Sequence, residues 1–317
     1  MDDGRAGDDG RVFAGATSRR AVLTALVGGA LGGLIAGAGA PLGRAAGVAT
    51  AANEEATMRT VRTDDGITIS YKTQGSGPRT VLFLHGWGGA LTYWDDFLAH
   101  VDLTGLRAIS ASYRGHGESD KPTTGYTIDR FAKDMFAVAD QEGADELVLV
   151  GFSMAGKFAQ YMAYSRPDRV RGQVLVAPCP AAEMPLPREV GRAWIEAAPD
   201  RARFRELLAP FLKVPPKPEL LDLYLDNVAR TPRVALEATL EMFAYTSIVD
   251  EARTVTAPTL VVGGAADPML PPDYLREQVL GVIGGARLAL LDCGHETPIE
   301  LPQETAGLLE AFIAGHR

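Results

Sequence analysis

One serine of the chain stands where a strand could present it as a nucleophile. The largely apolar run 146–150 leads into Gly151, Phe152, Ser153, Met154 and Ala155, and a helical pattern begins directly afterwards. A strand, a tight turn with small residues on both sides of a serine, and a helix form the context of a nucleophile elbow. Such a turn would place the Ser153 hydroxyl at the amino end of a helix, where free N–H groups favour negative charge.

A serine hydroxyl is barely ionised at neutral pH, so Ser153 needs a base within hydrogen-bonding reach. Histidine is the side chain whose pKa best suits this role. The chain has five histidines, and only His295 stands in a Gly-His step between the last predicted strand and an apolar helix. We expect His85 and His116, which lie in glycine-rich loops, to shape the backbone there. His295 is therefore the predicted base.

A carboxylate is needed to orient the imidazole, and Asp267 is the best-placed candidate. It follows the apolar run 259–262 in an Ala-Asp-Pro turn. The same three residues are also ordinary turn chemistry. Glu183 is the nearest carboxylate after the preceding predicted strand, whereas Asp292 is better suited to capping its own loop. We therefore predict a catalytic triad of Ser153, Asp267 and His295.

The elements that would position these residues follow a regular pattern from residue 58 onward. Short apolar runs alternate with longer amphipathic stretches, which predicts an α/β fold with a mostly parallel, eight-stranded sheet covered by helices on both faces. The predicted strands span residues 58–63, 67–74, 80–84, 107–112, 146–150, 170–177, 259–262 and 287–291. The predicted helices between them span residues 128–142, 154–166, 272–280 and 303–314. The first two strands would form a hairpin at Asp65-Gly66.

One segment interrupts this alternation. Between about 181 and 252 there is no buried-strand pattern, and a proline-rich break occurs at 214–218. Helical patterns fill the segment instead, at 190–198, 201–212, 219–227 and 234–243. Insertions at the carboxyl ends of parallel strands commonly cover a site. We therefore expect a helical lid at about 181–252.

From about residue 80 to residue 314 the chain resembles the α/β-hydrolase family, particularly its esterase and cofactor-free haloperoxidase-like branch. Residues 85–89 (HGWGG) match the family's oxyanion loop, and residues 113–119 (YRGHGES) match its structural loop. The Asp267 turn and the Gly-His step match the acid and histidine positions, in the family order of nucleophile, acid and histidine. Ala155 replaces the more usual glycine, and Ser112 stands where many relatives have aspartate. Neither departure changes the expected chemistry.

The resemblance implies a serine hydrolase that works through an acyl-enzyme. Ser153 would attack a carbonyl with help from His295 and Asp267, and the backbone N–H groups of Trp87 and Met154 would form the oxyanion hole. The substrate would be a carboxylic ester or lactone of small to medium size and apolar character. The same triad also permits a C–C bond hydrolase, a perhydrolase or haloperoxidase-like enzyme, or an acyltransferase. A ligand-binding member of the fold without catalysis is a further alternative.

Composition narrows the possible partners. The 317 residues include 31 basic and 40 acidic side chains, a formal net charge of −9. Nucleic-acid binding needs clustered cations, so this chain is not expected to bind nucleic acid. It contains no Rossmann or P-loop motif, and the expected reaction needs no metal, so we expect neither cofactor nor metal site. The two cysteines, Cys179 and Cys293, are expected to be buried thiols, with a single disulfide as the alternative.

The amino-terminal residues have a composition of their own. Arg19-Arg20 precedes an uncharged run at 21–40, and small-residue sites occur at 38–40 and 49–51. A positive pair, an apolar run and an A-x-A site are typical of a signal peptide, and the arginine pair resembles the twin-arginine type. A membrane anchor takes roughly 20 apolar residues, but the glycines of this run weaken it as a spanning helix. We predict a signal peptide and disordered segment at 1–52, a hydrolase domain at 53–317, and export. Membrane contact would arise only through an uncleaved signal.

Overall fold

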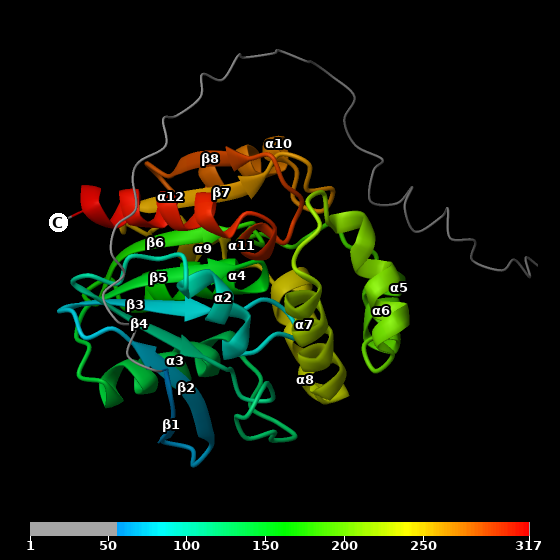
Figure 1. Cartoon of the computed structure of the whole chain (residues 1–317), viewed down its shortest axis with the longest axis horizontal. Coiled ribbons are helices and arrows are strands. Elements are labelled where there is room, and N and C mark those ends of the chain that lie inside the picture. Colours follow the sequence, from blue (N-terminus) through cyan, green and yellow to red (C-terminus); the bar gives the residue numbers. More distant parts are fainter. Residues whose placement is uncertain (1–55, 317) are drawn as a thin grey trace, which may run out of the picture. The chain divides into compact units, whose positions relative to one another are not determined.

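The computed structural model of the protein describes residues 56–316 (Figure 1). The predicted signal segment therefore lies outside the described residues. The strands are β1 (Thr57–Arg62), β2 (Thr68–Gln74), β3 (Arg79–Leu84), β4 (Leu106–Ala111), β5 (Leu147–Phe152), β6 (Val170–Val176), β7 (Thr259–Gly264) and β8 (Arg287–Leu291).

These strands form one eight-stranded sheet in the order β1-β2-β4-β3-β5-β6-β7-β8. The hairpin strands β1 and β2 pair antiparallel, and β2 also runs antiparallel to β4. Every pair from β4 to β8 is parallel. All six residues of β5, at the centre, are buried, as expected for a strand that is covered on both faces. The predicted mostly parallel, eight-stranded α/β sheet is confirmed.

Helices cover both faces of this sheet. On one face, a Cβ on Gly151 of β5 would lie 3.1 Å from Ala159 of α4 (Met154–Ser165). On the other face, a Cβ on Gly172 of β6 would lie 3.0 Å from the Phe312 ring of α12 (Pro302–Gly315). α3 (Ile128–Gln141) packs beside α4, and α2 (Asp95–Leu98) packs beside α12. Glycines in the central strands thus let helices approach closely on both sides.

A buried arginine ties the hairpin to the helical layer. Arg114, in the 113–119 loop, donates hydrogen bonds to Asp65 in the hairpin turn, at 2.9 and 3.1 Å. It also donates to Asp134 of α3, at 2.6 and 2.8 Å. A buried guanidinium is tolerated only when its donors are paired in this way. The loop therefore has the structural role that the resemblance implied.

The segment between β6 and β7 is helical. It contains α5 (Arg188–Ala197), α6 (Arg201–Leu208), the 3-10 turn η2 (Ala209–Phe211), α7 (Pro218–Arg230), α8 (Arg233–Tyr245) and α9 (Val249–Ala252). In Figure 1 the arrowheads of β3, β7 and β8 point toward α5–α8, so these helices lie beyond the carboxyl ends of the strands. The buried ammonium of Lys157 donates to the carbonyls of Ala182 and Thr246, at 2.9 and 2.7 Å. This lysine of α4 thereby joins the two ends of the segment.

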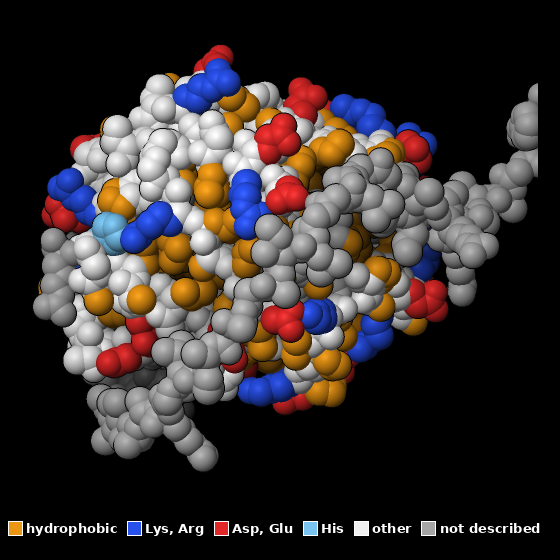
Figure 2. Space-filling view, turned by 90° about the horizontal axis from the view of Figure 1, so that it is seen from above, with side chains coloured by type: hydrophobic (Ala, Val, Ile, Leu, Met, Phe, Trp, Pro, Cys, Tyr) orange, Lys and Arg blue, Asp and Glu red, His pale blue; other side chains and the backbone are white. Residues whose placement is uncertain are grey.

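Shorter elements complete the described chain: the 3-10 turn η1 (Leu91–Trp94), α10 (Pro272–Leu275), the π-helical turn η3 (Arg276–Leu280) and α11 (Thr297–Glu300). None of the helices within residues 56–316 is both long enough and apolar enough to cross a membrane. On the face in Figure 2, the basic and acidic side chains are interspersed among apolar ones.

Candidate active site

Ser153 occupies the sharp turn between β5 and α4. Its φ of 52° lies in the left-handed region, where a residue other than glycine is strained. The turn leaves no room for larger neighbours: a Cβ on Gly151 would lie 2.5 Å from the carbonyl oxygen of Ala155. A Cβ on Gly156 would lie 2.3 Å from Pro178. The small residues in the sequence motif are therefore a steric requirement of this turn.

The structure brings the three predicted residues together at the carboxyl ends of β5, β7 and β8. The imidazole Nε2 of His295 lies 2.9 Å from the Ser153 hydroxyl, and its Nδ1 lies 2.7 Å from a carboxylate oxygen of Asp267. All three side chains are buried, with Ser153 the most exposed at 9%. The geometry is that of a hydroxyl, a base and an orienting carboxylate in a continuous hydrogen-bonded chain.

Asp267 is held by its own loop. One carboxylate oxygen accepts from the backbone N–H groups of Met269 and Leu270, at 2.8 and 3.1 Å, which leaves the other for His295. The competing carboxylates lie elsewhere. Asp292 is exposed and pairs with Lys213, and Glu183 is exposed. Of the acids considered from the sequence, Asp267 is the one that reaches the imidazole.

Burial and charge act in opposite directions on His295. Burial lowers the pKa of the imidazole, whereas the adjacent Asp267 carboxylate raises it, with smaller contributions from Glu296 and Glu300. The net result is a pKa above the ordinary value of 6.5. A base with such a pKa is neutral, and able to accept a proton, only at pH values above it.

The 85–89 loop lies directly over the serine turn. A Cβ on Gly86 would lie 3.5 Å from the Cβ of Ser153 and 2.9 Å from the Phe152 ring. A backbone turn in this loop is closed by the Gly89 N–H, which donates to the Gly86 carbonyl at 3.1 Å. Within residues 56–316, the backbone N–H groups of Trp87 and Met154 have no hydrogen-bond partner. Both amides are therefore free to bind an anion, as an oxyanion hole requires.

The helical segment between β6 and β7, called the insertion below, holds the 85–89 loop in place. The hydroxyl of Tyr224 in α7 donates to the carbonyl of Trp87 at 3.0 Å. The indole N–H of Trp87 donates to the carbonyl of Leu236 in α8, also at 3.0 Å. These contacts could not be read from the sequence, because they join positions more than a hundred residues apart in irregular and helical segments.

A small apolar cavity of about 50 Å³ adjoins His295. Apart from His295, its walls are apolar and come mainly from the insertion: Trp87, Trp194, Phe204, Leu207, Leu208, Phe211 and Met269. Because one ordered water needs roughly 10–15 Å³ on this measure, the cavity holds only a few atoms. The sequence offered no signal for these residues beyond aromatic side chains in amphipathic helices.

The remaining sequence candidates have structural surroundings. His85 Nδ1 lies 2.8 Å from the Gly86 carbonyl, and its Nε2 accepts from the Tyr113 N–H at 3.3 Å. Burial lowers the pKa of His85, so its imidazole is neutral and fits the predicted loop-shaping role. Cys179 and Cys293 are free and buried, as expected. Burial raises the pKa of Cys179 to about 12, so this thiol beside Ser153 is not a nucleophile.

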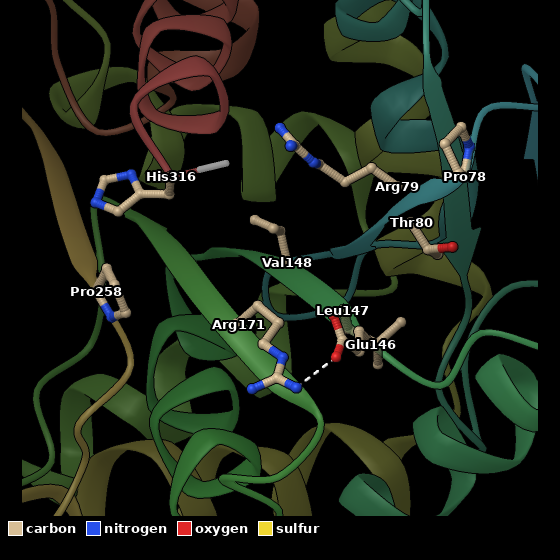
Figure 3. A pocket seen from close by; sticks show the side chains of 9 residues that line it. All are labelled: Pro78, Arg79, Thr80, Glu146, Leu147, Val148, Arg171, Pro258 and His316. Carbon is tan, nitrogen blue, oxygen red and sulfur yellow. Dashed lines mark hydrogen bonds and ion pairs between the residues drawn. The ribbon is translucent and has the colours of Figure 1, made fainter.

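A wider hollow of about 710 Å³ lies at the opposite end of the strands from Ser153 (Figure 3). Its walls include Arg79, Val148, Pro258 and His316, and its one drawn ion pair joins Arg171 to Glu146. Arg79, Val148 and Arg171 lie at the amino ends of β3, β5 and β6, whereas Ser153 follows the carboxyl end of β5. The hollow is therefore separate from the Ser153 site.

Comparison with known proteins identifies the family. Residues 79–227 match the family described as alpha/beta hydrolase fold. The chain is 32% identical to a non-heme chloroperoxidase of Streptomyces lividans, over 68% of this chain and 84% of that protein. It is 31% identical to lipase LipV of Mycobacterium tuberculosis, over 75% of this chain and 94% of that protein.

A solved structure agrees with these relatives. Est816, described as an N-acyl homoserine lactone degrading enzyme, superposes with a TM-score of 0.70 at 28% identity, covering 80% of this chain and all of that one (100%). The chain belongs to the α/β-hydrolase family, and it is an enzyme of that family.

Proposed function

We propose that this enzyme is a serine hydrolase that cleaves a carboxylic ester or lactone through an acyl-enzyme. The observation that carries the proposal is the continuous chain of hydrogen bonds from Asp267 through His295 to Ser153, with distances of 2.7 and 2.9 Å. Such a chain supplies what a weakly acidic hydroxyl lacks, a base that is held in the correct tautomer.

In the proposed reaction, the Ser153 oxygen attacks the substrate carbonyl carbon while its proton passes to Nε2 of His295. The backbone N–H groups of Trp87 and Met154 hold the resulting oxyanion, and each such donor contributes roughly 3 kcal/mol in the transition state. His295 then protonates the departing alcohol. Water, deprotonated by His295, attacks the acyl carbon and releases the acid and the free serine. Asp267 stabilises the imidazolium that forms in both halves.

The substrate assignment is supported by the walls of the cavity and by the relatives. Aromatic and aliphatic side chains beside His295 favour an apolar acyl group of few atoms. LipV is named a lipase, and Est816 is described as acting on a lactone. The similarity to a chloroperoxidase favours a second candidate function: perhydrolysis, in which hydrogen peroxide replaces water in the second half of the reaction.

We also propose that α5–α8 act as the lid over this site. The proposal is supported by Trp194, Phe204 and Phe211, which the segment contributes to the cavity beside His295.

Export by a twin-arginine-type signal is a separate proposal, based on Arg19 and Arg20 before the apolar run. Its test is amino-terminal sequencing of the secreted protein. An Arg19→Lys, Arg20→Lys variant should remain inside the cell, and equal secretion of that variant would contradict export by this route.

The experiment that tests the hydrolase proposal is a substrate panel with product analysis. Purified enzyme is assayed against p-nitrophenyl esters of graded acyl length and against lactones, with Ser153→Ala as the control. We expect hydrolysis of short-chain esters or lactones by the enzyme and none by the variant. Added alcohol or hydrogen peroxide distinguishes the alternatives, because an acyltransferase yields mainly ester and a perhydrolase yields peracid. A folded enzyme inactive on every substrate would favour a ligand-binding role.

A further inference from the structure

A second buried carboxylate, outside the predicted triad, binds the backbone on both sides of His295. Glu300, at the end of α11, is 5% exposed. One of its oxygens accepts from the N–H of Gly294 at 3.0 Å, and the other accepts from the N–H of Glu296 at 3.1 Å. The two residues that flank the proposed base are thus fixed to one side chain.

The same carboxylate also holds part of the insertion. The oxygen that binds Gly294 accepts from the N–H groups of Lys213 and Val214, at 2.8 and 2.7 Å. Beside this pair, the N–H of His295 itself donates to the carbonyl of Phe211 at 2.7 Å. Residues 211–214 and 294–296 therefore form one hydrogen-bonded unit with Glu300 at its centre. Phe211, whose side chain lines the apolar cavity, belongs to that unit.

The close packing around Glu300 leaves no room for a side chain at position 294. A Cβ on Gly294 would lie 2.1 Å from the Phe211 carbonyl oxygen and 2.9 Å from a carboxylate oxygen of Glu300. The Lys213 ammonium pairs with Asp292 and not with Glu300. The donors to this carboxylate are thus four backbone N–H groups, which satisfy both of its oxygens and fix its position.

We propose that Glu300 is a positioning residue that holds His295 in reach of Ser153 and docks segment 211–214, with the cavity wall, onto the His295 loop. This inference rests on the proposed function. Glu300 does not touch Ser153 or the imidazole; it acts through the backbone. Its removal should therefore impair both the proton transfer and the fit of the acyl group.

The pH dependence of activity provides a second test of the role of Glu300. The ionisable groups facing His295 are Asp267 from the β7 loop and Glu296 and Glu300 from its own loop and α11, and all three raise the pKa of the imidazole. Tyr93, from η1, donates its hydroxyl to Glu296 at 2.8 Å. Burial raises the pKa of Glu296 itself to about 7, so this group is partly protonated in the same pH range. Replacing Glu300 by glutamine removes its contribution, so the pKa of His295 should fall. The acid limb of the activity profile should then move to lower pH.

The test compares Glu300→Gln and Glu300→Ala with Glu304→Gln, an exposed carboxylate in the first turn of α12. Glutamine keeps one accepting oxygen but turns an N–H donor toward another donor. We expect kcat/KM to fall in the order wild type, Gln, Ala, by roughly 10- to 100-fold for Ala, since misplacement by about 1 Å can cost on the order of 100-fold. Glu304→Gln should match the wild type in rate and in pH profile.

Hydrogen exchange keeps the inference testable if the Glu300 variants fail to fold. In the wild-type protein the amides of Lys213, Val214, Gly294 and Glu296 should exchange together, as one unit that opens cooperatively. Independent exchange of the two segments would overturn the inference. So would a folded Glu300→Gln with wild-type kcat/KM and an unmoved acid limb. If Ser153→Ala keeps full activity, the proposed function fails instead, and the exchange result remains a separate test of the docking.

Discussion

Asp267 and His295 are 28 residues apart in the sequence, and their side chains meet at 2.7 Å. They follow β7 and β8, which are neighbours in the sheet. The two loops touch closely, because a Cβ on Gly264 would lie 1.8 Å from the carbonyl oxygen of Gly294. The pairing of carboxylate and imidazole is thus a direct consequence of two adjacent parallel strands that end at the same edge.

Replacing Asp267 by asparagine tests the orienting role. The amide cannot stabilise an imidazolium and favours the wrong tautomer, so kcat should fall on the order of 10⁴-fold while the protein stays folded. Asp292→Asn is the matched control, since Asp292 is exposed and lies three positions before His295 in the chain. Steady-state kinetics on an ester checks both. Equal kinetics of the two variants would refute the assignment of Asp267.

The pH dependence follows from the raised pKa of His295. The imidazole must be neutral to accept the Ser153 proton, so activity should be lost as the pH falls through that pKa. The midpoint of the acid limb of kcat/KM should therefore lie above 6.5, the ordinary value for histidine. In Asp267→Asn, the residual activity should show a lower midpoint, because the carboxylate that raises the pKa is gone. A wild-type midpoint below the ordinary value would contradict this account of the site.

Gly294 is expected to tolerate no side chain. Alanine there would place a Cβ 2.1 Å from the Phe211 carbonyl oxygen, so the insertion and the His295 loop would have to separate. We expect Gly294→Ala to lower the free energy of unfolding by about 1–3 kcal/mol and to reduce activity. Gly307→Ala in α12, where a Cβ meets nothing within 4 Å, should instead stabilise by about 0.5–1 kcal/mol. Urea denaturation of both variants measures the difference, and a neutral Gly294→Ala would contradict the packing described.

Leu207 is a cavity wall that can be shortened at low cost, because it is only half-buried. Leu207→Ala should shift the preferred acyl chain to a longer length, by on the order of 10-fold in kcat/KM per methylene accommodated. Leu220→Ala, half-buried in α7 and not part of this cavity, serves as the control. The ester panel measures both. An unchanged chain-length preference in Leu207→Ala would mean that the acyl group binds elsewhere.

The sheet could be predicted because each strand carries its own local signal. Continuous apolar runs marked the central strands, and the predicted 287–291 strand coincides with β8. Boundaries differed where tertiary structure decides them. β5 continues to Phe152, beyond the predicted end at 150, because the strand runs directly into the serine turn. The predicted helix 201–212 ends as α6 at Leu208 and tightens into η2, which contains Pro210.

The residues around the triad could be predicted only in part. Ser153, Asp267 and His295 each follow a strand, so parallel topology alone brings them to one edge. Glu300 gave no such signal, because the Lys213 N–H that it accepts lies 87 positions away in the insertion. The aromatic walls of the cavity could not be predicted either. The helix face that turns toward His295 depends on how the insertion packs and not on local sequence.

Covalent labelling of the wild-type enzyme with a fluorophosphonate probe, followed by mass spectrometry of the peptides, tests the central claim most directly. The hydroxyl oxygen displaces fluoride from phosphorus only if a base takes its proton, so labelling reports the assembled pair of Ser153 and His295. The account predicts one modified residue, Ser153, with labelling lost in His295→Ala and Ser153→Ala. A folded wild-type enzyme that stays unlabelled, or one labelled at another residue, would contradict it.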